Sequence, residues 1–277
     1  MADWSCGGCV VGDQESAPSS AAKLTAERIK SRPASGDSGF RPAYYAARSG
    51  PWRDWWTLLH PPYTAWHLAY VVIGASLAPH VQTTRLLATV LAFFLAVGLA
   101  AHALDELNGR PLRTRIPSRV LVAVAAAGIT GSVALGVMGF IQIGWAVLPF
   151  LCVGPIVLLA YNLELFGGIF HNGLTFAAAW GAFPVLTAYV AQTGRLAPAP
   201  VIAGVAAAVM SLAQRALSTP ARLLRRRATK VEGAIVLADG RTVPLDREVL
   251  LAPLEKALRV MSWSVVLFAV SVAVVRL

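Results

Sequence analysis

The sequence predicts an all-α membrane protein, a polytopic bundle of about seven transmembrane helices. Its 277 residues are 56% hydrophobic, only 14% of them are charged, and the mean hydropathy is +0.61. A soluble domain has about 25% charged residues. Apolar runs of roughly 17–23 residues recur along the chain, and each is long enough to cross a hydrocarbon layer of about 30 Å.

Four regions are expected in chain order. A polar tail over residues 1–50, rich in Ser, Ala, Gly and Pro, is expected to be disordered. It carries Cys6 and Cys9 without a secretory signal, and three cysteines in all do not make a disulfide framework. A six-span core (51–219), an insert (220–259) and a last span (260–277) follow. The expected spans are 62–80, 86–104, 119–140, 143–163, 173–193, 198–217 and 260–277.

The insert over 220–259 has two predicted elements. Apolar residues alternate on both sides of Asp239-Gly240, which is typical of a β-hairpin. Residues 247–259 are expected to form a helix along the membrane surface. The basic run from Arg222 to Lys230 favours contact with anionic lipid headgroups over contact with nucleic acid.

The distribution of basic residues orients the bundle. If the chain has seven spans, 21 of its 24 Lys and Arg residues fall on one side, and only Arg85, Arg195 and Arg276 fall on the other. By the positive-inside rule, we expect the N-terminus in the cytoplasm and the C-terminus outside, in a plasma (inner) membrane.

Acidic residues are rare within the bundle. Between Trp55 and Val231 only Asp105, Glu106 and Glu164 occur, all at the predicted cytoplasmic ends of spans. Charged groups near membrane depth are costly and often functional, and acids at a helix C-terminus oppose the helix dipole. A shared polar site is therefore favoured over simple capping of the helix ends.

Other polar residues support this site. His102 shares a helical face with Asp105 and Glu106, and His171 follows Glu164 across Gly167-Gly168. The set can bind a divalent metal, with Mg²⁺ or Mn²⁺ favoured by oxygen ligands and Fe or Zn tolerated by imidazole. Arg110 and Arg113 are candidates for binding a diphosphate, with Asn108 nearby. An ordinary positive-inside loop explains these arginines about equally well.

Three stretches resemble the UbiA superfamily of membrane prenyltransferases, most closely its dihydroxynaphthoate branch in the menaquinone pathway. The stretches run from Leu59 to Ala75, from Ala101 to Gly109 and from Tyr161 to Gly194. The resemblance implies a reduced UbiA-like fold that acts on a prenyl diphosphate or isoprenoid lipid by metal-assisted transfer or ionisation. Asp105 and Gly109 match the family's first acidic motif, and we expect Asp105 and Glu106 to act in catalysis and to hold the metal with His102.

The sequence also departs from that family. Ala101 and His102 replace the Asn and the first Asp of the first acidic motif, and no acid stands between Ser211 and Thr219, where the second motif is expected. Two alternatives therefore stay open. One is a lipid oxidoreductase or hydrolase that depends on Fe or Zn. The other is a non-catalytic protein that binds a quinone or polyprenyl lipid.

Overall fold

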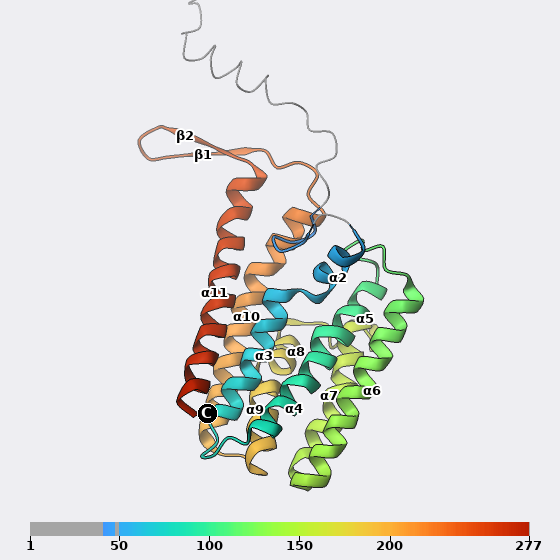
Figure 1. Ribbon diagram of the computed structural model, residues 1–277. Coiled ribbons are helices and arrows are strands. Elements are labelled where there is room, and N and C mark those ends of the chain that lie inside the picture. Colours follow the sequence, from blue (N-terminus) through green and yellow to red (C-terminus); the bar gives the residue numbers. More distant parts are fainter. Residues whose placement is uncertain (1–40, 48–49, 277) are drawn as a thin grey trace, which may run out of the picture. The chain divides into compact units, whose positions relative to one another are not determined.

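The computed structural model describes residues 41–47 and 50–276, which form a bundle of long helices with one β-hairpin (Figure 1). The predicted tail, including Cys6 and Cys9, lies almost entirely outside the described residues. Within them, six helical stretches are long and apolar enough to cross a membrane: Thr83–Leu107, Ser118–Ile143, Trp145–Asn162, Gly173–Thr193, Pro198–Arg226 and Arg247–Arg276. The chain is therefore a membrane-integral helical bundle.

The first predicted span differs from expectation. Helix α2 (Pro51–Leu59) ends at His60, and α3 (Pro61–Ser76) has only 16 residues. The break occurs at Pro61-Pro62, because a proline has no backbone N–H to continue α2 and disfavours helical geometry in the residue before it. His60 accordingly adopts φ 47°. Because α3 is shorter than the other six stretches, the count of long apolar helices is six rather than seven.

Helix α3 nevertheless lies in the interior of the bundle, packed against α9 (Phe183–Thr193) and α11 (Arg247–Arg276). At Gly74 the helices approach so closely that an added Cβ would lie 2.2 Å from the Val185 carbonyl oxygen. Gly181 has the same role against α10 (Pro198–Arg226), where a Cβ would lie 2.7 Å from the Ala207 carbonyl oxygen. Small residues allow such backbone contact between membrane helices.

Two of the long stretches contain π-helical segments. The second expected span consists of α4 (Thr83–Phe93), the π-helix η1 (Phe94–Ala101) and α5 (His102–Leu107). The fifth consists of α8 (Gly173–Ala177), the π-helix η4 (Ala178–Ala182) and α9. A π-turn changes the helical phase, so each segment resets which side chains face the interior, and such turns are frequent at functional sites.

The third and fourth spans are α6 (Ser118–Ile143) and α7 (Leu148–Asn162), joined by the short 3₁₀ helix η2 (Trp145–Val147). After α7 the chain turns through η3 (Phe166–Gly168), where Glu164, Phe166, Gly167 and Gly168 all have positive φ. The predicted glycine break between Glu164 and His171 is therefore present.

The insert contains the predicted hairpin. Strands β1 (Gly233–Val236) and β2 (Thr242–Leu245) pair antiparallel, with Gly240 at φ 82° in the turn. Residues 247–259, however, do not form a separate surface helix. They continue without a break into the last span, because the chain from Leu254 to Val275 has neither glycine nor proline to interrupt the helix.

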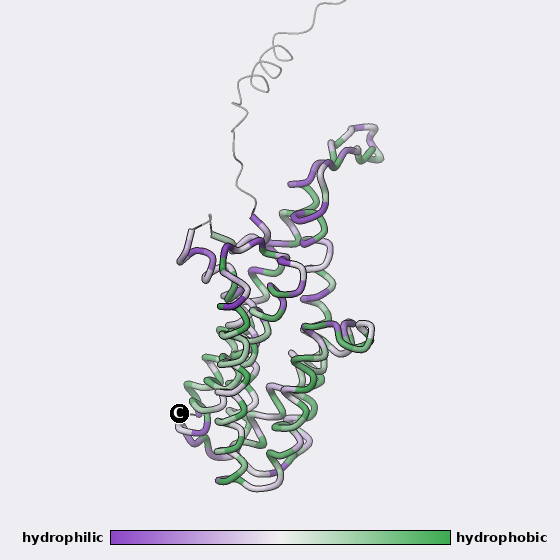
Figure 2. Tube along the Cα trace, turned by 90° about the vertical axis from the view of Figure 1, so that its right-hand side faces the viewer, coloured by the Kyte–Doolittle hydropathy of each residue, from purple (hydrophilic) through white to green (hydrophobic). Residues whose placement is uncertain are grey.

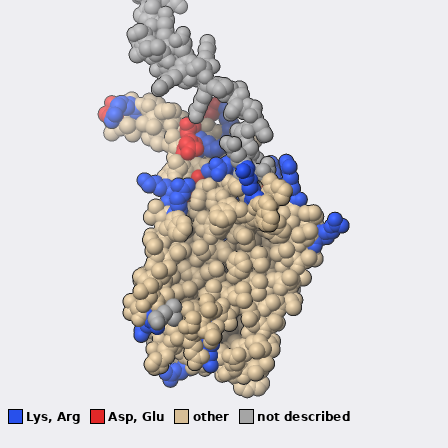
Figure 3. Space-filling model, in the orientation of Figure 1, with Lys and Arg blue, Asp and Glu red and all other residues tan. Residues whose placement is uncertain are grey.

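Polar and apolar residues of the described chain are distributed unevenly along the length of the bundle. Figure 2 shows apolar residues over most of the helices, whereas polar residues gather toward the end that carries the hairpin. Basic side chains form a band at that same end, and few of them lie at the opposite end (Figure 3). The charge asymmetry of the sequence is thus an asymmetry of the folded bundle.

Candidate functional site

A polar cavity of about 390 Å³ lies at the basic end of the bundle. Its walls come from α3, α5, the α7–α8 connection, α10, α11 and the segment 42–45. Of the predicted site residues, the cavity is lined by His102, Asp105, Asn108, Glu164 and His171. Two spans far apart in the sequence therefore contribute to one polar cavity, as the acid pattern indicated.

Asp105 reaches the cavity from α5, immediately after the π-helix η1. His102 precedes it by three residues, so the two share one helical face. Among the described residues, no hydrogen bond or ion pair within 4 Å holds the Asp105 carboxylate. It lies within electrostatic range of His171, Arg222 and Arg226.

Glu106 has a different environment from its neighbour. It is 0% exposed, and its carboxylate accepts hydrogen bonds from Leu112 N at 2.9 Å, Thr114 N at 2.8 Å and Thr114 Oγ1 at 2.9 Å. Asp54 holds the same loop by accepting from Arg115 N at 2.9 Å. Glu106 does not line the polar cavity, because one residue along a helix rotates the side chain by about 100°.

Arg110 and Arg113, the predicted diphosphate ligands, do not line the cavity either. The Arg110 guanidinium donates to the Ile116 carbonyl at 2.6 Å and to Ser118 Oγ at 2.6 Å, so it holds the start of α6. Arg113 is exposed in the same loop, with φ 55°. The expected guanidinium site is therefore not assembled by these two residues.

Arginines of α10 line the cavity in their place. They are Arg215, Arg222, Arg225 and Arg226, and Arg227, the residue after the helix, also lines the cavity. Arg215, Arg222 and Arg226 are separated by seven and four residues, which places them along one face of the helix. Within the described chain, none of these three has a carboxylate oxygen within 4 Å. Part of the basic run from Arg222 to Lys230, for which we expected contact with lipid headgroups, thus belongs to the cavity wall.

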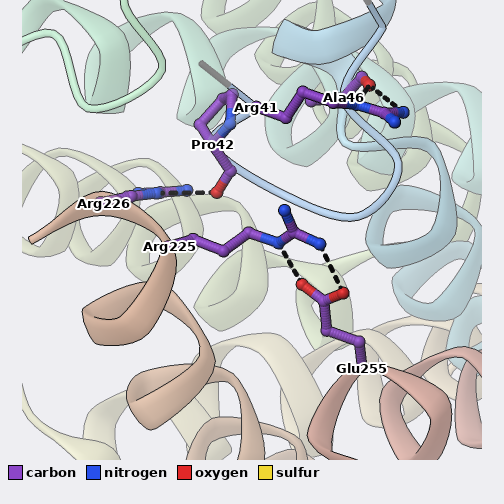
Figure 4. A network of polar contacts seen from close by, with 6 residues as sticks. All are labelled: Arg41, Pro42, Ala46, Arg225, Arg226 and Glu255. Atoms are coloured by element: carbon purple, nitrogen blue, oxygen red, sulfur yellow. Dashed lines mark hydrogen bonds and ion pairs between the residues drawn. The ribbon is translucent and has the colours of Figure 1, made fainter. Parts of the chain in front are cut away.

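Each of these three guanidiniums has a neutral partner. Arg215 Nη1 donates to Tyr161 Oη at 2.5 Å, and its guanidinium carbon lies 5.5 Å from the Phe176 ring centroid. Arg222 Nη2 lies 3.4 Å from Thr219 Oγ1. Arg226 Nε donates to the Pro42 carbonyl at 3.1 Å (Figure 4). Because a neutral partner does not offset the positive charge, this wall of the cavity is electropositive.

Arg225 differs from these residues because it is neutralised. It makes a two-pronged contact with the Glu255 carboxylate of α11, in which Nη2 donates to Oε2 at 2.6 Å (Figure 4). Close by, the Arg41 guanidinium folds back onto the Ala46 carbonyl at 2.8 Å. The segment 42–45 lies against the cavity, and Arg226 holds it there.

Four histidines line the cavity, and each points Nδ1 at a backbone carbonyl. The distances are 2.7 Å for His60 to Leu58, 2.9 Å for His67 to Trp180, 3.1 Å for His102 to Gly98 and 3.1 Å for His171 to Tyr161. A carbonyl only accepts, so Nδ1 donates and Nε2 keeps a lone pair in the neutral ring. Burial, together with the neighbouring His102 ring, holds the pKa of His60 well below its ordinary value.

Several side chains of the polar cavity are of types that can bind a metal ion. Glu164 Oε1 lies 3.8 Å from His171 Nδ1. Across residues 41–47 and 50–276, however, no three His, Cys, Asp or Glu side chains converge closely enough to hold a metal ion. Glu106 is engaged elsewhere. Asp105, His102 and the Glu164–His171 pair are the remaining candidates, and the metal stays a prediction.

A second, apolar cavity of about 790 Å³ lies between α4, α6, α7 and the stretch from α8 to α9. Its lining includes Phe93, Val97, Leu158 and Phe183. Trp180 lines both this cavity and the polar one. An apolar space therefore lies on one side of Trp180 and a charged space on the other.

The α10 wall was not predicted from the sequence, although the seven-and-four spacing of its arginines is a signal for it. Gln214, His67 and Glu255 were not predicted as site residues either, although His67 lies in the Leu59–Ala75 stretch and Gln214 lies between Ser211 and Thr219. Comparisons with protein-family models, with curated proteins and with solved structures find no match. The resemblance to the UbiA superfamily therefore stays a prediction.

Proposed function

We propose that this protein is a membrane enzyme that binds a phosphorylated isoprenoid lipid, with the phosphate against the arginines of α10 and the hydrocarbon chain in the apolar cavity. The observation that carries the proposal is the electropositive face of Arg215, Arg222 and Arg226 in a cavity that shares Trp180 with a larger apolar one. Guanidinium groups bind phosphate oxygens in a bidentate manner.

The two cavities suit the two parts of such a lipid. Volumes of about 390 and 790 Å³ lie within the usual range of ligand pockets. The apolar cavity presents few polar groups to a ligand, whereas the polar one presents three arginines that have no carboxylate within 4 Å in the described chain. A lipid with a charged head and an unbranched or methyl-branched chain matches this division.

The reaction that we propose is transfer or ionisation of the lipid diphosphate. Arg215, Arg222 and Arg226 would stabilise the negative charge that develops on the leaving group. Asp105 would act opposite them, from the other wall. If Mg²⁺ takes part, Asp105 with His102 or Glu164 would hold it, and it would supply further stabilisation of the leaving group.

A non-catalytic role in binding a lipid is the second candidate. It is favoured by the observation that no three metal-capable side chains converge among the described residues. Binding would then require the arginines but not Asp105.

We also propose that α3 crosses the membrane as a seventh helix and that the polar cavity faces the cytoplasm. The basic band at the hairpin end supports this orientation by the positive-inside rule (Figure 3). Anionic headgroups at Arg222–Lys230 remain compatible with it, because Arg227 and Lys230 are exposed.

Binding of labelled farnesyl diphosphate to the purified protein tests the proposal. We expect Arg215→Gln and Arg222→Gln each to weaken binding by about 10- to 100-fold, since a hydrogen bond to a charged group contributes about 1.5–3 kcal/mol. Arg195→Gln is the matched control, because Arg195 is exposed and lies at the opposite end of the bundle. Equal affinities for all four proteins would contradict the proposal.

A further inference from the structure

Two nearly buried side chains of the polar cavity have hydrogen-bonding groups that the protein leaves unused. They are His67 of α3 and Gln214 of α10, and each is 4% exposed. Neither takes part in the predicted acid site or in the arginine wall. Because buried polar groups are nearly always hydrogen-bonded, both need an explanation.

The protonation of His67 follows from its contact with the bundle. Its Nδ1 lies 2.9 Å from the Trp180 carbonyl oxygen, which can only accept a hydrogen bond. The proton of the neutral ring is therefore on Nδ1, and Nε2 presents a lone pair. No donor among the described residues reaches Nε2.

Gln214 is the second unused group. Its Oε1 is buried without a hydrogen-bond partner, and its amide nitrogen makes no hydrogen bond within the described chain. Leaving such a group unsatisfied costs about 1–3 kcal/mol. A carboxamide offers both a donor and an acceptor, so it can complement a ligand group that also does both.

The two side chains belong to one place in the fold. Helices α3 and α10 run antiparallel, since α3 begins and α10 ends at the polar cavity. One level deeper, Tyr70 of α3 and Ser211 of α10 are both buried, and neither hydroxyl has a hydrogen-bond partner in the described chain. Three residues toward the cavity from that pair, along the same helical faces, are His67 on α3 and Gln214 on α10.

We propose that His67 and Gln214 bind the hydroxyl group of a lipid alcohol at the junction of the two cavities. The hydroxyl would donate to His67 Nε2 and accept from the Gln214 amide nitrogen, while Gln214 Oε1 keeps no partner in this contact. An ether or a carbonyl cannot donate, so it would leave Nε2 unpaired. Trp180, which holds His67 and lines both cavities, places this site beside the space for the chain.

This proposal rests on the proposed function only for the position of the hydrocarbon chain. It adds a ligand without phosphate, because the hydroxyl site does not use the arginine wall. The alcohol is the species that remains when a lipid loses its phosphate, or that receives a transferred group. Recognition of both species would place the protein at a step that interconverts or joins them.

The test compares the binding of farnesol with that of farnesyl methyl ether to the full-length protein in nanodiscs. The two probes share a chain and differ in the ability to donate a hydrogen bond. We expect farnesol to bind about tenfold more tightly, which corresponds to about 1.4 kcal/mol. Equal binding of the two probes by the unmodified protein would overturn the proposal, because water then satisfies the two side chains.

Two variants locate the effect. In His67→Asn the amide can still donate to the Trp180 carbonyl but lacks the Nε2 acceptor, so the ratio should fall toward one. Gln214→Met should also lower the ratio of the two affinities. Because this change is on another helix, it tests the site even if His67→Asn fails to fold. His80→Asn and Gln82→Met are exposed controls at the opposite end and should keep the tenfold ratio. A ratio that survives in both cavity variants overturns the site.

Farnesyl diphosphate separates this inference from the proposed function. If the diphosphate binds through Arg215 and Arg222 while farnesol and its ether bind equally, only the hydroxyl site is wrong. If farnesol is preferred through His67 but the diphosphate does not bind, only the phosphate site is wrong.

Discussion

The imidazole rings of His60 and His102 lie stacked, with centroids 4.3 Å apart and ring planes 17° apart. His60 stands in the break between α2 and α3, and His102 begins α5. Both rings donate through Nδ1 to backbone carbonyls, at Leu58 and Gly98. The stack therefore joins two helices through neutral rings, and a proton added to either ring would oppose it.

The first prediction concerns acid sensitivity. Burial and the neighbouring His102 hold the pKa of His60 well below its ordinary value. The unfolded chain takes up this proton near pH 6.5 and the folded chain does so only at lower pH, so His60 destabilises the folded protein below about pH 6.5 and has no pH-dependent effect above it. We expect the free energy of unfolding to fall as the pH drops below 6.5, by up to about 1.4 kcal/mol per pH unit for this one proton.

Replacement of the ring isolates its share of the effect. His60→Asn retains a residue type that tolerates the left-handed φ of 47° but cannot titrate. Thermal unfolding between pH 7.5 and 4.5 should show a shallower pH dependence for this variant. An unchanged slope would mean that His60 is already accessible to protons in the folded state.

The second prediction concerns the contact between α10 and α11. The Arg225 and Glu255 side chains are 24% and 12% exposed, and they form a two-pronged ion pair. Glu255→Gln should destabilise the protein by about 1–3 kcal/mol, because it leaves a partly buried guanidinium without its counter-charge. This figure is smaller than for a fully buried pair, since solvent screens the partners.

A double variant distinguishes the loss of the pair from the loss of packing. Arg225→Met with Glu255→Leu removes both charges and keeps apolar volume, so it should recover most of the stability. Thermal unfolding in detergent measures both proteins. If the double variant is less stable than Glu255→Gln alone, packing of the long side chains rather than charge holds α11 to α10.

The third prediction separates Glu106 from Asp105. Glu106→Gln replaces an acceptor oxygen with an NH₂ group that faces the donors of Leu112 and Thr114. We expect a loss of about 1–3 kcal/mol in stability and faster proteolysis between Asn108 and Pro117. Glu164→Gln is the control and should change neither quantity, because Glu164 is exposed. If Glu106→Gln resists proteolysis as well as the unmodified protein does, Glu106 does not hold this loop in place.

These residues also show how far the sequence could predict the structure. Hydropathy located the six long helices, since each must bury its backbone polar groups within an apolar run. The Asp239-Gly240 turn located the hairpin, because few residue types accept its backbone geometry. The predicted boundary between a surface helix (247–259) and a last span (260–277) was wrong, because a change from polar to apolar residues does not by itself end a helix.

The candidate site was predicted in part. Asp105, Glu164 and His171 do line one cavity, because acids in a bundle poor in charge have few stable positions. The different roles of Asp105 and Glu106 could not be derived, since the π-turn of η1 sets the helical phase and leaves no clear mark in the sequence. The pairing of Arg225 with Glu255 depends on a contact across 30 residues, which no local pattern encodes.

The fourth prediction concerns topology. An epitope tag inserted between Asp239 and Gly240 should be reached by antibody only after the inner face of the membrane is exposed. A tag at the C-terminus should be reached from outside, because α11 carries the chain across the bilayer. The turn tolerates an insertion, since its residues are exposed and no side chain packs on Gly240. Detection of both tags on one side would mean that α11 does not span the membrane.

The last prediction tests whether a metal ion acts beside Asp105. The carboxylate faces Arg222 and Arg226 across the polar cavity, and no hydrogen bond in the described chain holds it. Asp105→Asn should therefore leave stability almost unchanged, because the amide has the same size and breaks no contact. If Asp105 holds Mg²⁺ when the diphosphate is bound, this variant should bind farnesyl diphosphate about tenfold more weakly with Mg²⁺ and lose turnover. In EDTA its binding should be no weaker than that of the unmodified protein, because the carboxylate that it lacks would repel the anion.

The control for this prediction is Arg195→Gln, which should match the unmodified protein with Mg²⁺ and in EDTA. Tighter binding by Asp105→Asn with and without Mg²⁺ would mean that the α10 arginines hold the anion without a metal.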